Sequence, residues 1–322
     1  MSEKVLVKEV GSALPSHIDL FICAASYDSR TLSIVSTLAP LIVNKIIVFI
    51  DPGNSGAFGV DAVRYMSERF GEKVTVVEFD LANPLDIADK IVKAISNVQE
   101  ATGEVVVDIT TFTQEALLIL LRVLQISTLS GANTTGAYTG AGDYSVGLNA
   151  EGKWLTKGVL EIRSVLGFAG ESKPTQKQHL IVLAGYEVEL AEKTIDAYEP
   201  ALLSIGLGDP NESISKSLFD VNKWFHGKLI ERYREVKHFV FSCEDSTHTK
   251  DAILKQVQDY PGYNVQIAPM NTKISTVGVA LAAMEDTAIQ ICYALPAEYN
   301  REGYTSPGDF AYVFKLQIPK EK

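Results

Sequence analysis

Residues Gly103–Leu124, GEVVVDITTFTQEALLILLRVL, decide the fold of this chain. The stretch begins with a short apolar run that ends at Asp108, and a hydroxyl-rich turn, Thr110–Thr113, follows. The apolar residues from Ala116 onward then predict a largely buried helix. Backbone N–H groups at the start of a helix attract anions, and threonine hydroxyls there can either cap the helix or bind a ligand.

The same succession of features occurs a second time, near the end of the chain. Residues Asn264–Met284, NVQIAPMNTKISTVGVALAAM, again combine an apolar strand, a polar turn and a small-residue apolar helix. Asp108 of the first stretch aligns with Ala268 of the second, an offset of 160 positions. Such repetition of a structural unit at one spacing indicates an internal repeat.

Three further landmarks recur in the same order at nearly this offset. Each combines an apolar strand or a turn with an acidic residue. The pairs are Tyr27-Asp28 with Tyr186-Glu187, Asp51-Pro52 with Asp209-Pro210, and Asp143-Tyr144 with Glu298-Tyr299. We therefore predict an ancient internal duplication.

Strand-length apolar runs alternate with helical patterns in both halves. The predicted strands are 19–25, 46–50, 74–79, 105–107, 134–138, 180–184, 202–206, 238–242, 264–268 and 288–293. The predicted helices are 31–41, 60–70, 86–98, 116–124, 187–198, 213–234, 248–259 and 273–284. This alternation predicts an α/β fold with mostly parallel, doubly wound sheets, arranged as two tandem Rossmann-like units.

The expected units are residues 1–168 and 179–322, joined by a polar linker at 169–178. Residues 140–144 are expected to form a glycine-rich loop, and residues 153–167 fit either a hairpin or a strand. The alternating segment 310–318 is expected to form a final, antiparallel edge strand.

Composition excludes several classes of protein. The chain has 322 residues and a net charge of −11, which disfavours binding to long nucleic acids or to membrane surfaces. It has no apolar run long enough to span a bilayer and no secretory leader. Its cysteines, Cys23, Cys243 and Cys292, fit buried free thiols, so a cytoplasmic location is expected.

Cofactor and metal sites are not expected. Gly140-Ala141-Gly142 lacks the third glycine of a dinucleotide-binding loop, and no Walker phosphate loop occurs. The five histidines are scattered without ligand spacing.

The polar residues at the carboxyl ends of the predicted strands form the expected ligand site, because open parallel sheets bind ligands there. Tyrosines can stack on bases, while threonine, asparagine and lysine can hold phosphates. The candidate ligand-binding residues are Ser26, Tyr27, Asp28, Asp51, Asn54, Thr110, Thr111, Thr113, Tyr144, Gly185, Tyr186, Glu187, Asp209, Asn271, Thr272, Lys273 and Tyr299. We expect them to line a cleft between the two units, and no catalytic residue is assigned.

The Asp-Ile-Thr-Thr-Phe-Thr turn before an apolar helix resembles the ligand turn of CRISPR-associated Rossmann-fold (CARF) domains. Two such units in one chain resemble SAVED domains, which sense cyclic oligonucleotides in prokaryotic antiviral defence. The resemblance implies phosphate recognition at Thr110, Thr111 and Thr113, at Asn271, Thr272 and Lys273, and at Ser26 and Gly185. Phe112 and Thr113 stand where the family has glycine and lysine, so the first unit departs from the pattern.

The resemblance favours a nucleotide sensor that acts through a separate effector protein. Two alternatives remain open. Acids on the predicted rim fit a nucleotide-cleaving hydrolase of the ring-nuclease kind, since paired carboxylates can do acid–base work. The acidic surface also fits a non-catalytic interaction subunit of a defence complex.

Overall fold

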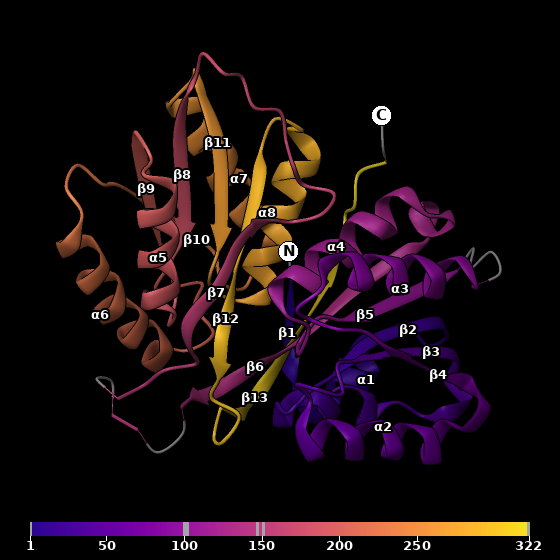
Figure 1. Ribbon diagram of the computed structural model, residues 1–322. Coiled ribbons are helices and arrows are strands. Elements are labelled where there is room, and N and C mark those ends of the chain that lie inside the picture. The colour runs from indigo at the N-terminus through magenta and orange to yellow at the C-terminus, as the bar shows by residue number, and fades with distance from the viewer. Residues whose placement is uncertain (1, 99–102, 146–147, 150–151, 321–322) are drawn as a thin grey trace. The chain divides into compact units, whose positions relative to one another are not determined.

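The computed structural model describes residues 2–98, 103–145, 148–149 and 152–320 (Figure 1). The chain divides into two compact units: Met1–Val146 together with Arg301–Lys322, and Gly147–Asn300. The first unit thus takes its last segment from the far end of the chain. The predicted boundaries are therefore wrong in two places: residues 301–322 belong to the first unit, and the predicted linker 169–178 lies inside the second.

The first unit is built on a seven-stranded sheet with the order β1-β13-β6-β5-β2-β3-β4. Strands β2 to β6 run parallel to one another, while β13 is antiparallel to both β6 and β1. The strands are β1 (Glu3–Leu6), β2 (Ile18–Ala25), β3 (Val43–Ile50), β4 (Val74–Glu78), β5 (Glu104–Asp108), β6 (Asn133–Tyr144) and β13 (Thr305–Lys315).

Helices cover both faces of this sheet, with α3 and α4 on one face and α1 and α2 on the other (Figure 1). The central strands are therefore apolar on both sides, and Phe21, Ile46 and Val106 are fully buried in the core. The helices are α1 (Val10–Ala13), α2 (Gly56–Phe70), α3 (Pro84–Ser96) and α4 (Gln114–Ile126).

The second unit is built on a six-stranded sheet with the order β10-β9-β8-β11-β12-β7. Strands β8 to β12 run parallel, and β7 is antiparallel to β12. The strands are β7 (Thr156–Ser164), β8 (Lys177–Leu183), β9 (Leu202–Gly208), β10 (Lys237–Phe241), β11 (Tyr263–Pro269) and β12 (Gln290–Tyr299).

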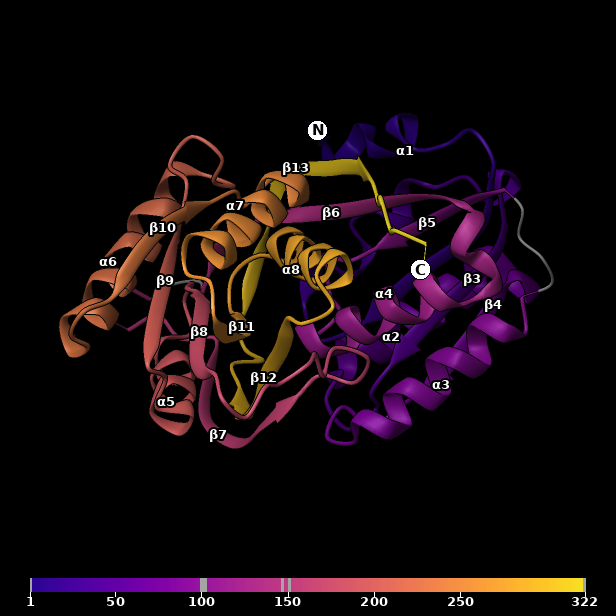
Figure 2. The same cartoon turned by 90° about the horizontal axis from the view of Figure 1, so that it is seen from above.

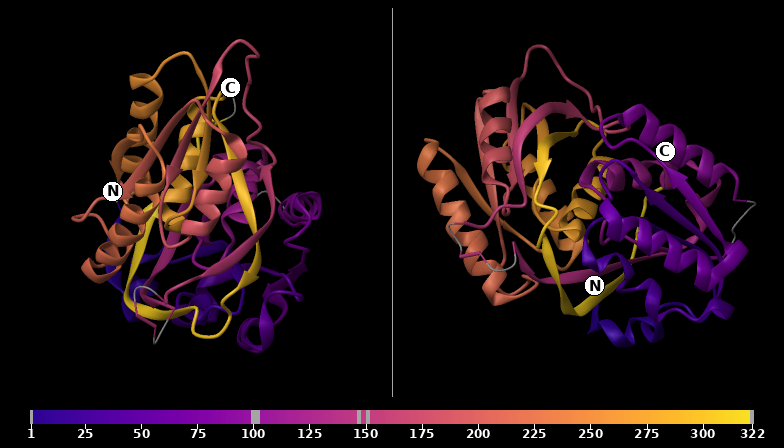
Figure 3. Two further views of the ribbon diagram at one scale, coloured as in Figure 1. Left: turned by 60° about the vertical axis from the view of Figure 1, so that its left-hand side comes forward. Right: turned by 60° about the horizontal axis from the view of Figure 1, so that its bottom comes forward.

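Four helices cover the second sheet, with α5 and α6 on one face and α7 and α8 on the other (Figures 2 and 3). They are α5 (Val188–Tyr198), α6 (Lys216–Arg232), α7 (Ser246–Asp259) and α8 (Lys273–Glu285). Across the described parts of the chain, no helix combines the length and apolar character that a membrane span requires.

Apart from β1, which extends the first sheet, the two sheets have the same strand order. In each, the five parallel strands lie in the order third, second, first, fourth and fifth, and an antiparallel strand follows. The first five positions match the Rossmann order, so both units are Rossmann-like. The antiparallel strands are exchanged along the chain: β7, which follows β6, completes the second sheet, whereas β13, which follows β12, completes the first.

Three local predictions differ from the structure. Residues 31–41 form 3₁₀ turns (η2, Ser29–Leu32; η3, Val35–Thr37; η4, Pro40–Ile42) in place of an α-helix. The expected loop at 140–144 belongs to the long strand β6, because β13 pairs with it as far as Tyr144. The predicted edge strand is β13, which is antiparallel as expected but lies between β1 and β6 in the first sheet.

The strand exchange predicts that neither half of the chain is complete by itself. A polypeptide of residues 1–168 lacks β13 and leaves one edge of β6 unpaired, so we expect aggregation and no cooperative thermal transition. A chain in which residue 146 is joined directly to residue 301 contains the whole first unit, and we expect it to fold. Ser145 N–H already donates to the Tyr304 carbonyl at 2.9 Å, which favours this junction.

Gel filtration and thermal unfolding followed by circular dichroism distinguish the two polypeptides. A monomeric, cooperatively folding 1–168 fragment would contradict the need for β13.

Candidate functional site

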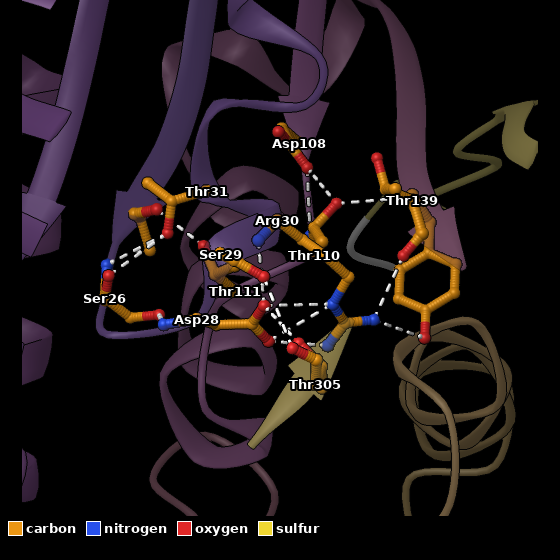
Figure 4. A network of polar contacts seen from close by, with 12 residues as sticks. Ser26, Asp28, Ser29, Arg30, Thr31, Asp108, Thr110, Thr111, Thr139 and Thr305 are labelled. Carbon is orange, nitrogen blue, oxygen red and sulfur yellow. Dashed lines mark hydrogen bonds and ion pairs between the residues drawn. The ribbon is translucent and has the colours of Figure 1, made fainter. Parts of the chain in front are cut away.

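A buried ion pair lies at the carboxyl end of the first sheet (Figure 4). Arg30 donates from Nη2 to Asp28 Oδ2 at 2.7 Å, and both side chains are about 95% buried. Burial alone would raise the pKa of the Asp28 carboxyl, but the Arg30 guanidinium holds that pKa below its ordinary value. Asp28 is therefore an anion whose charge is already balanced inside the protein.

The same pair connects three segments that are far apart in sequence. Asp28 Oδ1 accepts a 2.8 Å hydrogen bond from the Thr305 hydroxyl, at the first residue of β13. Arg30 Nη1 donates to the Thr139 carbonyl of β6 at 3.1 Å. Its guanidinium also lies 5.7 Å from the centre of the Tyr144 ring. The loop after β2, the end of β6 and the start of β13 are thus fixed to one another.

Asp108 and Thr110 form a second buried group beside this pair (Figure 4). Asp108 accepts hydrogen bonds from both the backbone N–H and the hydroxyl of Thr110. The Thr110 hydroxyl oxygen in turn accepts from Thr139 N–H at 3.0 Å. Burial raises the pKa of Asp108 to about 7, although the bonds from Thr110 oppose the shift. Thr110 is 2% exposed, so its side chain joins β5 to β6 inside the unit.

The other two threonines of the first turn are only partly buried. The Thr111 hydroxyl donates to the Ala24 carbonyl at the end of β2, with a length of 2.6 Å. Thr113 is the N-cap of α4 and accepts from Ala116 N–H at 3.2 Å. Glu115 follows in the first turn of this helix and is 1% exposed, so a buried acid stands close to the anion-attracting end.

Tyr27 and Tyr144 meet around a third tyrosine, Tyr304. Tyr304 makes edge contacts with Tyr27, at 5.2 Å between ring centres, and with Tyr144, at 6.3 Å. The two predicted stacking residues of the first unit are thus brought together, through a residue that follows β12.

The remaining candidates of the first unit organise their own turns. Ser26 accepts at its hydroxyl from Asp28 N–H at 3.1 Å. Asp51 accepts from Gly53 N–H at 2.8 Å, an arrangement that stabilises the turn after β3. Asn54 Oδ1 accepts from Arg301 Nη2 at 3.0 Å.

In the second unit, Glu187 lies at the carboxyl end of the sheet. Its Oε1 accepts a 2.8 Å hydrogen bond from the hydroxyl of Thr156, the first residue of β7. Burial raises the pKa of Glu187, whereas the bond from Thr156 and the positive charge of Lys273 oppose the shift. Glu187 and Lys273, which are candidate ligand-binding residues from different loops, are therefore close enough to interact electrostatically.

The turn before α8 is held by Asn271 and Thr272. Asn271 Nδ2 donates to the Ala184 carbonyl at the end of β8, with a length of 2.5 Å. Thr272 is the N-cap of α8 and accepts from Ser275 N–H at 3.2 Å, while its hydroxyl donates to the Cys243 carbonyl. All three residues of the turn, with Lys273 at the first helical position, are partly exposed.

Other candidates of the second unit have structural surroundings. A Cβ at Gly185 would lie 2.3 Å from the Met270 carbonyl oxygen, so the close approach of two loops requires glycine here. Tyr186 is 7% exposed and packs against Phe225. Asp209 accepts from Asn211 N–H at 2.7 Å within its turn. The Tyr299 hydroxyl lies 3.3 Å from that of Tyr293.

The carboxyl ends of the two sheets have several contacts of the same kind. Thr111 and Asn271 each donate to a carbonyl within one residue of the end of the first parallel strand, and Thr113 and Thr272 each cap the following helix. The acid in the loop after that strand accepts from the first residue of the antiparallel strand in both units. These acid–threonine pairs are Asp28 with Thr305 and Glu187 with Thr156.

The sequence patterns missed the residues that complete these groups: Arg30, Tyr304, Thr305 and Thr156. Arg30 lies two residues after the predicted site residue Asp28. A basic residue so near an acid was the signal that could have indicated the ion pair. Thr305 lies 277 positions from its partner Asp28, so no local pattern could indicate the contact. Within the described residues, no three acidic, histidine or cysteine side chains gather to hold a metal ion.

No protein-family model matches the sequence, and no curated protein matches it.

The solved structures found include the pyocyanin biosynthetic protein PhzM, at 14% identity and a TM-score of 0.26 over 44% of this chain. This chain spans only 38% of PhzM. The cytoplasmic domain of a prokaryotic cation chloride cotransporter matches at 11% identity and a TM-score of 0.26, over 88% of this chain and 98% of that one. The N-domain of a bacterial malonyl-CoA reductase matches at 9% identity and a TM-score of 0.25, over 84% and 78%. Similarity this weak does not bear on what the chain binds or does.

The Asp28–Arg30 pair yields a prediction about stability. Asp28→Asn leaves the Arg30 charge buried without its counter-ion, and we expect it to lower the free energy of unfolding by about 3–5 kcal/mol. The double substitution Asp28→Leu/Arg30→Met removes both charges and should lower it by clearly less. Urea denaturation measures both. Equal losses in the two proteins would show that the uncompensated charge is not the cause.

The raised pKa of Asp108 makes the stability of the fold depend on pH. Its folded pKa of about 7 lies above its ordinary value of 3.8, so in that interval the folded protein holds a proton that the unfolded chain has lost. The contribution of Asp108 to stability therefore falls as pH rises, by at most about 1.4 kcal/mol per pH unit, and levels off above pH 7.

Asp108→Asn should remove this slope, so the variant gains stability relative to the unmodified protein as pH rises from about 4 to 7. Urea denaturation across this range measures it. Asp89→Asn, at an exposed carboxylate on α3, is the matched control. A constant difference between Asp108→Asn and the unmodified protein would contradict the assignment.

Proposed function

We propose that this protein binds a nucleotide-type ligand, such as a cyclic oligonucleotide, at the carboxyl ends of its sheets. The proposal follows the rule that open parallel sheets bind ligands at that end, near helix N-termini. The observation that carries it is the turn Asn271-Thr272-Lys273, in which a partly exposed lysine begins a helix of 13 residues. A lysine and a helix N-terminus together favour a phosphate.

The first turns of α4 and α8, the equivalent helices of the two units, differ in charge. The first turn of α8 contains no acid, whereas the first turn of α4 contains Glu115. We therefore assign the phosphate to α8. The tyrosines around Tyr304 suit a base, since aromatic stacking contributes about 1–3 kcal/mol per base.

An internal duplication is part of the proposal. Equal strand order and equivalent contacts at Thr111 and Asn271, and at Asp28 and Glu187, support it. The resemblance to CARF and SAVED domains further suggests a sensor in antiviral defence that acts through a separate effector protein.

The proposal is tested by a thermal-shift screen of the full chain against mononucleotides, dinucleotides and cyclic oligonucleotides. A ligand at about 100 times its dissociation constant should stabilise the protein by about 2.7 kcal/mol. Liquid chromatography of each ligand afterwards separates the alternatives. An intact ligand supports a sensor, a cleaved ligand indicates a nucleotide hydrolase, and no shift with any nucleotide would favour an interaction subunit.

Lys273→Ala should weaken binding of the ligand that the screen identifies by about tenfold, because one charge-assisted contact to phosphate is lost. Loss of the positive charge near the buried Glu187 should lower the melting temperature of the unliganded protein, but the variant should remain folded at the temperature of the binding assay. Lys255→Ala, at an exposed lysine of α7, is the matched control. Unchanged affinity of the Lys273→Ala protein would remove the lysine from the site.

A further inference from the structure

We infer that the free edge of β4 is a docking surface for an extended, acidic segment of another protein. Strand β4 ends the first sheet and pairs only with β3 within the described residues. Figure 2 shows β4 at the margin of the sheet, with α3 beside it. An outer strand presents backbone N–H and C=O groups along its open edge, and an extended peptide can pair with them.

A groove of about 430 Å³ lies against β4, and residues of β3, β4 and α3 line it. Val76, Val77 and Ala94 supply apolar lining, and Val76 is 42% exposed. The exposed Thr75 also lines it. The groove therefore offers an apolar surface beside the strand edge, where the alternate side chains of a bound strand can pack.

The charge of the groove selects the partner. Three lysines line it, Lys45, Lys90 and Lys93, against a single acid, Glu78. Among the described residues, none of these lysines has an ion-pair or hydrogen-bond partner. The chain as a whole carries a net charge of −11, so this groove is locally basic on an acidic protein. An acidic strand is thus attracted to this edge in particular.

The same charges disfavour two other occupants. A second copy of β4 would bring a second set of lysines against the first, and like charges in opposition destabilise strand pairing. A single-stranded nucleic acid generally needs aromatic side chains on which its bases stack, and none lines the groove. The β4 edge is independent of the nucleotide site proposed above, so failure of one proposal leaves the other standing.

The experiment uses the full chain and a fluorescein-labelled peptide, Ac-Glu-Val-Glu-Val-Glu-Val-Glu-NH2, followed by fluorescence anisotropy at low ionic strength. We expect saturable binding. The sequence-matched peptide with lysine in place of glutamate should not bind. The glutamate peptide with alternate N-methylated residues should lose at least about tenfold in affinity, because it cannot form the strand hydrogen bonds.

Charge reversal locates the site. Lys90→Glu/Lys93→Glu should weaken binding of the glutamate peptide by about tenfold or more. Lys216→Glu/Lys223→Glu makes the same charge change at exposed positions of α6 and should leave binding unchanged. Circular dichroism checks that both variants are folded.

The inference would be overturned by several results. They are the absence of binding by the glutamate peptide, equal binding by the lysine or N-methylated peptide, and equal affinity in the Lys90→Glu/Lys93→Glu protein. Preferential binding of a labelled oligothymidylate over the glutamate peptide would also overturn it. In each case the lysines would be left with the role of protecting an open strand edge from aggregation.

Discussion

The buried ion pair between Asp28 and Arg30 holds together the carboxyl end of the first sheet. Its charges are taken out of water, and they are tolerated because each is hydrogen-bonded to the other and to neighbouring backbone. The pair joins the loop after β2 to β6 and, through Thr305, to β13. The antiparallel strand that completes the sheet is therefore attached by charge-assisted bonds as well as by its ladder.

The carboxyl end of the second sheet is held together by a similar contact that involves fewer charged groups. Glu187 occupies the position of Asp28 and accepts from Thr156 as Asp28 does from Thr305. Among the described residues of that unit, no arginine is paired with Glu187, and Lys273 supplies the nearby positive charge from the start of α8. The charges at the end of the first sheet are therefore balanced within the unit, whereas the second unit keeps a partly exposed lysine at the start of α8.

The sequence predicted the alternation of strands and helices because apolar runs such as Val105–Val107 are buried on both faces. It failed for residues 31–41, where Thr37 donates from its hydroxyl to the Ile34 carbonyl at 2.8 Å. Such local bonds compete with helical ones, and the segment forms 3₁₀ turns.

The positions of the candidate residues were predictable from the same alternation, since turns after parallel strands share one end of a sheet. The contacts that organise them were not. Thr305 and Tyr304 reach the first unit only because β13 is exchanged, and pairing over such distances leaves no local pattern in the sequence.

The exchanged strand also constrains how the protein is made. On the ribosome, Met1–Val146 is synthesised first. Strand β13, which completes the first sheet, becomes available only after all of Gly147–Asn300 has been synthesised. At about 5–20 residues per second, the unpaired edge of β6 stays open for roughly 8–30 s. Over that interval the edge of β6 that pairs with β13 in the finished protein has no strand partner, and an open edge of this kind is prone to aggregate.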